Sequence, residues 1–351
     1  MEVLLADPPA YTPPYDRALA AALAHAGASV TLLTSHFRYG PVARPDGYRA
    51  RETLYPLSSR LRGRARTLVR ALEHPLVLAA LAATRADVVH LQWSAAPGID
   101  AWLLRARAPI VFTAHDLLPR RTGHRTGAWR RLFARCARIV VHSENGRRTL
   151  AAFGVPPSKL RVVPHPVFPA AVDRRDDGRT VLALGSIRPY KGLDDAITAV
   201  RGVADARLLV AGDARGPLDR YRQAGGDAVE WQLGWLSPPE LAGVLARATV
   251  AVFPYRAELD QSGALLQALG AGLPAVVYDV GGLGEVVRAY EAGRVVPPGD
   301  VAGLTRALRE LLSDEEALAA ARSGAERARA ELTWDRAAAA HLDLYRGVAR
   351  C

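Results

Sequence analysis

Cysteine is almost absent from this sequence, and its scarcity excludes a fold held together by disulfide bonds. Cys136 and Cys351 are the only two cysteines in 351 residues, and no spacing of Cys and His is typical of a zinc site. No apolar run reaches the roughly 20 residues of a membrane span, since the longest covers Leu76–Ala83. A signal peptide begins with positively charged residues, whereas this sequence has the acidic residues Glu2 and Asp7 there. We therefore expect a cytoplasmic protein.

Several catalytic motifs are also missing, and each absence removes a class of chemistry. The sequence has no Gly-X-Ser-X-Gly elbow for a serine hydrolase, and no Gly-X-Gly-X-X-Gly loop for a dinucleotide after its first strand. It has no Asp-X-Asp at a strand end to bind a nucleotide through a metal, and no carboxylate pair in a glycosidase-like context. The first loop instead reads ADPPAYTPPYD. We expect no metal and no cofactor.

Lysine is nearly absent, although the chain is strongly basic. Of 46 Lys and Arg, only Lys159 and Lys191 are lysines. The charge is uneven: residues 1–166 hold 24 basic against 10 acidic residues, a net +14, and the remainder holds 22 against 25, a net −3. A basic first half indicates an anionic partner, whether a membrane, a lipid phosphate, a phosphorylated acceptor or a nucleic acid.

The sequence does contain a regular alternation of short apolar runs with longer helical periods. This alternation predicts α/β units with parallel sheets, and runs without polar alternation predict helices on both faces. A chain of this length divides most readily into two domains of about 150–200 residues. The predicted strands are Val3–Ala6, Val30–Leu33, Val88–Leu91, Ile110–Thr113, Ile139–Val141, Leu160–Val163, Val181–Leu184, Leu208–Ala211, Ala228–Gln232, Val250–Phe253 and Ala275–Val277.

A domain boundary is predicted at Pro164–Gly178, where three prolines and a charged run interrupt both periodicities. Residues 1–166 and 167–332 then form two Rossmann-like domains. A last helix begins at about Thr333, and no strand follows it. From the residues alone, this helix could pack on either domain.

Two loops in the second half have the character of a phosphate site. The strand Val181–Leu184 leads into GSIRPYKG, Gly185 to Gly192, which places Arg188 and Lys191 before a helix. Arginine donates in a fork, lysine adds a point charge, and the helix end offers backbone N–H groups, so the loop suits a diphosphate. A solvated basic turn is the alternative.

The second loop follows the strand Val250–Phe253. Gln261, Ser262 and Gly263 precede a helix whose amides face a phosphate or a sugar hydroxyl, and Gln267 lies one turn further along. Two such sites at neighbouring strand ends favour a phosphate ligand over ordinary turns.

In the first half, polar side chains follow two predicted strands. His90 lies in one strand with Gln92 and Trp93 behind it, and His115–Asp116 follow another. A histidine at a strand's carboxyl end can bond a ligand hydroxyl, but a structural histidine is an open alternative at both positions. Ser143 is better explained as the cap of a helix that starts near Glu144.

These motifs together resemble glycosyltransferase family 4, over nearly the whole length. The resemblance rests on VFTAHD at 111–116, HSENGRRTLAAFGVPPSKLRVVPHP at 142–166, GSIRPYKG at 185–192, VAGD at 210–213, QLGWLSPPEL at 232–241, FPYR at 253–256 and QSG…ALGAGLPAVVYDVGGLGE at 261–285. It implies the GT-B fold, two facing doubly wound domains with the active site in the cleft, completed by a last helix, 333–351, that returns to the first domain.

The resemblance also implies a function, a metal-independent retaining hexosyltransferase that uses a nucleotide-diphosphate sugar. It makes Arg188, Lys191 and His115 catalytic. The donor-binding residues it implies are Gly185, Gln261, Ser262, Gly263, Gln267, Trp235 and Leu236, and His90, Trp93 and Asp116 fall on the acceptor side. The family's two glutamates, eight apart, fall here on Leu259 and Gln267, with Glu258 one position off.

The acceptor stays open at this point: a polysaccharide, a lipid-linked sugar or a small glycoside. The arginines of the first half fit either docking on an anionic face of the inner membrane or a solvated surface. A nucleotide-sugar 2-epimerase of the same fold is one rival. A nucleic-acid-binding protein is another, although it leaves the Gly185–Gly192 loop unexplained and the aromatics do not interleave with the arginines.

Overall fold

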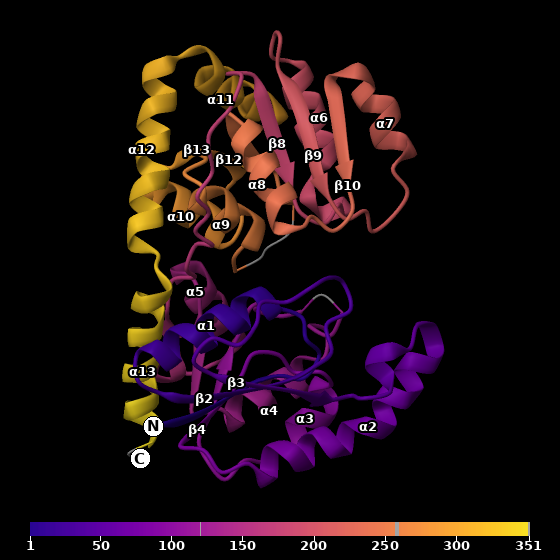
Figure 1. Ribbon diagram of the computed structural model, residues 1–351, viewed down its shortest axis with the longest axis vertical. Coiled ribbons are helices and arrows are strands. Elements are labelled where there is room, and N and C mark those ends of the chain that lie inside the picture. Colours follow the sequence, from indigo (N-terminus) through magenta and orange to yellow (C-terminus); the bar gives the residue numbers. More distant parts are fainter. Residues whose placement is uncertain (120, 257–259, 350–351) are drawn as a thin grey trace. The chain divides into compact units, whose positions relative to one another are not determined.

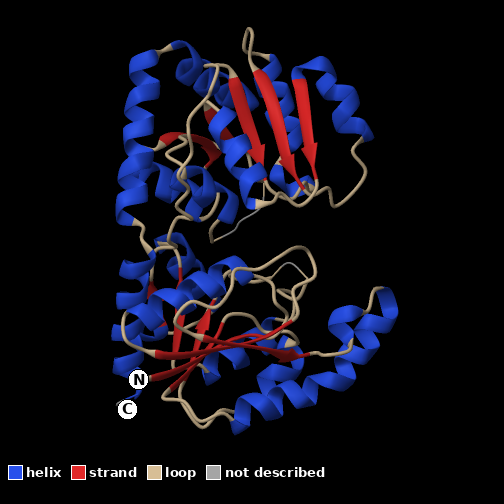
Figure 2. Ribbon diagram, viewed as in Figure 1, coloured by secondary structure: helices blue, strands red, loops and turns tan. Residues whose placement is uncertain are grey.

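The computed structural model describes residues 1–119, 121–256 and 260–349, which divide into two compact units. Unit 1 comprises Met1–Pro164 and Trp334–Cys351, and unit 2 comprises His165–Thr333. Each unit is built on its own parallel sheet, with helices packed against the strands (Figure 2). This is the doubly wound α/β architecture that the alternating sequence pattern predicts.

The sheet of unit 1 has the strand order β3-β2-β1-β4-β5-β6-β7, and all neighbouring strands are parallel. Its central strands bury both faces, as the apolar runs require: all four residues of Val88–Leu91 are buried. The strands are β1 Glu2–Asp7, β2 Ser29–Ser35, β3 Arg49–Leu54, β4 Val88–Leu91, β5 Ile110–Thr113, β6 Arg138–Val141 and β7 Leu160–Val162.

Helix α5 of unit 1 begins and ends at capping residues that the sequence offers. Ser143 caps α5 by accepting the Gly146 amide at 2.8 Å, which confirms the predicted cap, and Gly154 ends this helix in the left-handed region. The helices are α1 Pro13–His25, η1 Ser58–Arg60, α2 Gly63–Ala83, α3 Pro97–Leu103, α4 Thr126–Arg135, α5 Glu144–Phe153, η2 Pro157–Lys159 and α13 Trp334–Ala349.

The last helix, α13, belongs to unit 1 although unit 2 separates it from the rest in sequence. It packs against α1 and β4. Tyr345 of α13 is fully buried and reaches His90 in β4. Unit 1 therefore has a core to which both ends of the sequence contribute.

The sheet of unit 2 has the order β10-β9-β8-β11-β12-β13, again with parallel neighbours. Separate apolar cores lie on its two faces, one including Phe253 and Leu269 and the other Ile197 and Leu308. The strands are β8 Thr180–Leu184, β9 Arg207–Gly212, β10 Val229–Leu233, β11 Val250–Phe253, β12 Ala275–Tyr278 and β13 Gly293–Val296. The helical segments (Figure 1) are η3 Pro189–Lys191, α6 Leu193–Arg201, α7 Asp219–Gly225, η4 Gly226–Ala228, α8 Pro238–Arg247, α9 Gly263–Gly270, α10 Gly282–Tyr290, α11 Val301–Ser313 and α12 Glu315–Glu331.

Every strand predicted from the sequence forms, and two more appear at sheet edges. β3 is mostly exposed and polar, so it lacks the apolar run of a buried strand. β13 starts at Gly293, where an added Cβ would lie 1.8 Å from the Ala275 carbonyl oxygen. Edge strands need less apolar surface than central ones, which explains why hydrophobicity did not reveal them.

Candidate functional site

The loop between β8 and α6 has a conformation that two glycines make accessible. Gly185 has φ +106° and Gly192 has φ +66°, both in the region that disfavours other residues. A Cβ on Gly192 would lie 2.0 Å from the Pro254 carbonyl oxygen, so this loop runs directly against the loop that follows β11. The two loops meet because β8 and β11 are neighbours in the sheet, as the sequence pattern requires.

Arg188 and Lys191 both lie in this loop at the carboxyl end of β8. Arg188 is exposed, and Lys191 is half-buried with its Nζ 4.9 Å from the centre of the Tyr255 ring. Neither cation forms an ion pair with a carboxylate among the described residues. Together with Gly185 and Tyr255 they line a small pocket. Two cations without counter-charges at one strand end provide a site for an anion.

The N-terminus of α9 lies beside the same pocket. Ser262 caps the helix, with its Oγ 3.4 Å from the Leu265 amide and 3.2 Å from the Tyr255 hydroxyl. A Cβ placed on Gly185 would lie 3.0 Å from Lys191 Nζ and 3.3 Å from Ala264 Cβ, so the ammonium group and the helix start converge on one point. The helix end adds N–H groups and a positive dipole to the charge of Lys191.

Gln261 precedes this cap and is held by its own hydrogen bond. Its Nε2 donates to the Gly282 carbonyl oxygen at 3.2 Å, while its Oε1 is buried and has no donor among the described residues. Gly263 is exposed at the first position of α9. Gln261, Ser262 and Gly263 therefore lie together at the helix start, as predicted.

Arg256 holds together the loop after β8 and the loop after β11. The sequence alone did not indicate this role. Its guanidinium contacts Asp195 at 2.6 and 3.0 Å and Asp194 at 2.9 Å, and its amide donates to the Tyr190 carbonyl oxygen at 2.8 Å. The Tyr278 hydroxyl donates to Asp195 at 3.2 Å. The hydrogen bond to Asp195 raises the pKa of Arg256. Asp194 and Asp195 thus tie the FPYR segment to the start of α6.

The remaining donor-side candidates lie further along the same sheet. Gln267 is half-buried on α9, one turn beyond Gly263. Trp235 is 48% exposed and Leu236 packs on the core, both in the loop after β10 at the edge of the sheet. Glu258 and Leu259 lie outside the described residues.

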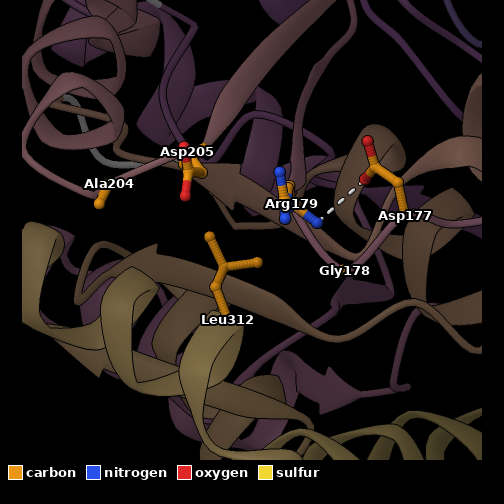
Figure 3. A pocket seen from close by; sticks show the side chains of 7 residues that line it. Asp177, Gly178, Arg179, Ala204, Asp205 and Leu312 are labelled. Carbon is orange, nitrogen blue, oxygen red and sulfur yellow. Dashed lines mark hydrogen bonds between the residues drawn. The ribbon is translucent and has the colours of Figure 1, made fainter.

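A second concavity in unit 2, of about 330 Å³, lies on the opposite edge of the sheet (Figure 3). Residues just before β8 and β9 line it, with Leu312 of α11 below. Ligands of open α/β sheets bind beyond the carboxyl ends of strands, and this concavity lies at the amino ends. Its larger volume does not make it the site.

In unit 1, His115 lies in a cluster of aromatic rings at the carboxyl ends of β1, β4 and β5. Its Nε2 lies 2.9 Å from Gln92 Oε1, and its ring stacks on Trp93 at 5.4 Å between centroids. The Tyr15 ring meets it edge-on at 4.7 Å. His115 is half-buried, as is Asp116 beside it. Gln92 is fully buried, and its Nε2 has no acceptor among the described residues.

His90 does not belong to this cluster, contrary to its assignment to the acceptor side. It is fully buried, with Nδ1 2.6 Å from the Tyr345 hydroxyl and Nε2 2.7 Å from the Thr113 hydroxyl. Burial holds the pKa of His90 well below its usual range. Both ring nitrogens are used inside the core, so His90 is structural.

Asp7 and Asp16 form a buried carboxyl pair that the sequence did not reveal. Asp7 ends β1 and accepts the amides of Tyr11 at 2.7 Å and Thr12 at 3.1 Å, which shapes the Pro-rich loop. Asp16 lies on α1, and its carboxylate accepts the Thr12 hydroxyl at 3.3 Å. Burial, and then the charge of Asp7, raise the pKa of Asp16 well above its usual range.

Trp93 links this pair to the ring cluster. Its indole N–H donates to the Thr12 hydroxyl at 2.9 Å, and the Tyr11 ring meets it edge-on at 5.3 Å. The Pro-rich loop therefore supports Trp93, which in turn stacks on His115. Each predicted group assembles within its own unit: Arg188, Lys191 and the α9 start in unit 2, and His115, Trp93 and Asp116 in unit 1.

Over the part of the chain that the structure describes, no three His, Cys, Asp or Glu side chains lie close enough to hold a metal ion. Over the same residues, no helix combines the length and apolarity that crossing a bilayer demands.

Comparison with known proteins assigns the chain to a family. Residues 17–170 match the family described as Glycosyltransferase Family 4, and residues 178–314 match Glycosyl transferases group 1. A glycogen synthase of Mycobacterium tuberculosis is 30% identical over 285 residues, which cover 74% of this chain and 69% of that protein. The chain belongs to glycosyltransferase family 4. This confirms the resemblance that the motifs indicate.

Further relatives of this glycosyltransferase agree. A phosphatidyl-myo-inositol mannosyltransferase of Mycobacterium leprae is 31% identical over 244 residues, 65% of each protein. The chain thus spans about two thirds of the length of these curated relatives. Among solved structures, sucrose-phosphate synthase from Thermosynechococcus elongatus matches with a TM-score of 0.77 at 21% identity, over 99% of this chain and 98% of that one. Anabaena HepE, solved in complex with UDP and glucose, matches with a TM-score of 0.70 at 16% identity over the whole of both chains. The glycosyltransferase therefore has the GT-B fold.

Proposed function

We propose that this glycosyltransferase transfers a hexose, with retention of configuration and without a metal ion, from a nucleotide-diphosphate sugar to a hydroxyl group. The acceptor is a glycan, a lipid-linked sugar or a small glycoside. The observation that carries this proposal is the convergence of Arg188, Lys191 and the start of α9 on one point at the carboxyl ends of β8 and β11. The UDP complex of the similarly folded Anabaena protein supports a nucleotide donor.

The charge at this site fits the demand of the reaction. The bond between the sugar and the leaving phosphate oxygen breaks, a bond to the acceptor oxygen forms on the same face, and the acceptor proton passes to the leaving diphosphate. Negative charge therefore grows on the diphosphate. Two preorganised cations and the helix N–H groups stabilise that negative charge, so the positive charge of a metal ion is not needed. The Tyr255 ring, 4.9 Å from the Lys191 Nζ, adds a cation–π contact that favours this position of the ammonium group.

Other residues receive positioning roles under this proposal. Gln267 bonds the ribose hydroxyls in place of the family's glutamate, and Trp235 with Leu236 flanks the base. In unit 1, His115 faces the transferred sugar, and Trp93 and Asp116 serve the acceptor side. Gln92 orients His115 for this role, since its Oε1 lies 2.9 Å from the His115 Nε2. The arginine-rich surface of residues 1–166 meets an anionic surface.

Replacement of Lys191 by alanine tests the diphosphate site. We expect kcat to fall at least about tenfold, because a preorganised charge at the leaving group is lost, while the thermal unfolding temperature stays near that of the wild type. Lys159→Ala is the matched control, since Lys159, the other lysine, only caps backbone carbonyls of Ala134 and Cys136 in unit 1. Near-normal turnover of a folded Lys191→Ala variant would refute the assignment.

The donor and the stereochemistry are measured separately. UDP-, GDP-, ADP- and dTDP-sugars are compared by thermal shift, because a bound donor stabilises the fold by mass action. The anomeric configuration of the first product is read by NMR, with EDTA present. An inverted anomer, or loss of turnover in EDTA, would contradict the proposed mechanism, and conversion of donor without acceptor would favour an epimerase.

A further inference from the structure

Helix α2 of unit 1 exposes leucines that a helix in water normally buries. Leu68, Leu72 and Leu76 are 69%, 79% and 67% exposed, and their spacing of four residues aligns them along one side of the helix. Ala65, Ala71, Pro75 and Ala79, also exposed, extend the same side. We call Leu68, Leu72 and Leu76 the leucine ridge. A contiguous apolar ridge of this kind marks an interaction surface rather than scattered exposure.

Buried polar residues on the opposite side of α2 determine that the leucine ridge faces solvent. The carboxylate of buried Glu73 accepts the amides of Leu57 at 2.8 Å and Ser58 at 3.1 Å. The ring of buried His74 lies 2.6 Å from the Tyr55 hydroxyl and 2.7 Å from Asp100 Oδ1. Rotating the helix to bury the leucines would break these buried hydrogen bonds. The exposed ridge is therefore a consequence of the fold.

The charge around the ridge has one sign. Arg60 ends η1, Arg62 precedes α2 and Arg64 lies in its first turn. All three are exposed, and none forms an ion pair with a carboxylate among the described residues. The only acid in the α2 sequence is Glu73, which is buried. The exposed surface of α2 is thus apolar along its length and cationic at its N-terminal end.

We propose that α2 docks unit 1 on an anionic lipid membrane, with the leucine ridge inserted among the headgroups and Arg60, Arg62 and Arg64 bound to lipid phosphates. An apolar face combined with arginines suits a helix that lies in the plane of a bilayer surface. The ridge spans about 12 Å along the helix axis, which fits such a lying orientation. This inference specifies the anionic surface of the proposed function, but it does not depend on the chemistry of transfer.

A second copy of the chain is a less suitable occupant of this surface. A twofold interface places the same patch on both partners, so the arginines at the helix start would be brought toward one another without acids between them. A glycan is also less suitable, because leucines offer no hydrogen bonds to sugar hydroxyls. Charge complementarity therefore favours lipid phosphates.

Sedimentation of the full chain with lipid vesicles tests the docking. We expect binding to vesicles of phosphatidylcholine with phosphatidylglycerol, and little binding to phosphatidylcholine alone. A triple variant, Leu68→Gln, Leu72→Gln and Leu76→Gln, should bind at least about tenfold more weakly. Leu233→Gln, at an exposed leucine of unit 2 (39% exposed), is the control and should bind as the wild type does. Turnover on a soluble acceptor should be unchanged in both variants, which separates this outcome from a failure of the proposed transferase activity.

Two further measurements keep the inference open to refutation. The double variant Arg62→Gln, Arg64→Gln should bind the anionic vesicles more weakly than the wild type at low salt. In about 1 M NaCl, where charges are screened, the two proteins should bind equally. Equal binding of the triple variant and the wild type would overturn the proposal. So would a dimer of the wild-type chain, seen by sedimentation velocity without lipid, that the triple variant abolishes, because the ridge would then be an interface between copies.

Discussion

The two units place their candidate ligand groups by different means. Unit 2 uses one loop and one helix end: glycines at 185 and 192 shape the loop, Ser262 caps the helix, and Arg256 holds the loops together. Unit 1 uses side chains: His115 is oriented by Trp93, Tyr15 and Gln92, which come from separate segments. A site made by one loop and one helix end tolerates little change in its loop. A site made of stacked rings depends instead on the packing of the whole unit.

The largest effect should follow from breaking the loop of unit 2. Gly192→Ala adds a Cβ 2.0 Å from a backbone oxygen, at φ +66°, so the loop with Arg188 and Lys191 must move. Because a displacement of about 1 Å can cost a hundredfold in rate, we expect kcat/KM to fall by about that factor or more.

The matched control for this substitution is Gly243→Ala in α8. Nothing lies within 4 Å of a Cβ at Gly243, and alanine favours a helix, so activity and stability should be kept or improved. If Gly192→Ala retained the kinetics of the control, the rigidity assigned to unit 2 would be wrong.

The second prediction concerns the packing of unit 1. Tyr345→Phe removes the hydroxyl that meets His90 Nδ1 at 2.6 Å and leaves a buried nitrogen without its partner. We expect the free energy of unfolding of unit 1 to fall by about 1–3 kcal/mol, measured by urea denaturation. Donor binding should stay within about twofold of the wild type, since His90 does not touch ligands in our assignment. Tyr11→Phe, at an exposed tyrosine, should leave unfolding unchanged, and a comparable loss there would show that the urea measurement does not report the buried contact.

The smallest effect should be a pH dependence that comes from Asp16. Its pKa is raised in the folded chain, so its contribution to stability is complete below the ordinary carboxyl pKa and is lost as pH rises toward the raised value. Asp16→Asn cannot ionise. The unfolding temperature of the variant should therefore gain on the wild type between pH 5 and pH 8, by roughly 1–3 °C in thermal scans. Asp343→Asn, at an exposed acid of α13, should show no such trend, and parallel curves for Asp16→Asn and the wild type would contradict the raised pKa of Asp16.

The sequence allowed much of unit 2 to be predicted because its site is local. Arg188 and Lys191 are three residues apart, Gln261 to Gly263 are consecutive, and the β-branched strands before both loops are easily recognised. These motifs can be predicted because their residues lie close together in the sequence. Arg256 was missed as a positioning residue because its partners, Asp194 and Asp195, are about sixty residues away.

Unit 1 could be predicted less well, for physical reasons. Whether His90 was a ligand or a core residue depended on Tyr345, 255 residues further along the chain. Asp7 and Asp16 look like ordinary polar residues of a loop and a helix until the fold buries both. On α2, the composition showed arginines and leucines, but only the partners of Glu73 and His74 decide which side faces outward.

The place of α13 in unit 1 has a consequence for how the protein is made. Residues 1–164 emerge from the ribosome first, yet their core lacks Tyr345 until all of unit 2 has been synthesised. At about 5–20 residues per second, the synthesis of unit 2 separates Tyr345 from residues 1–164 by roughly 10–40 s. During this time the earlier half of unit 1 waits with part of its apolar interior uncovered. Translation that stops before residue 334 would leave a folded unit 2 beside an incomplete partner, a species that chaperones or proteases must handle.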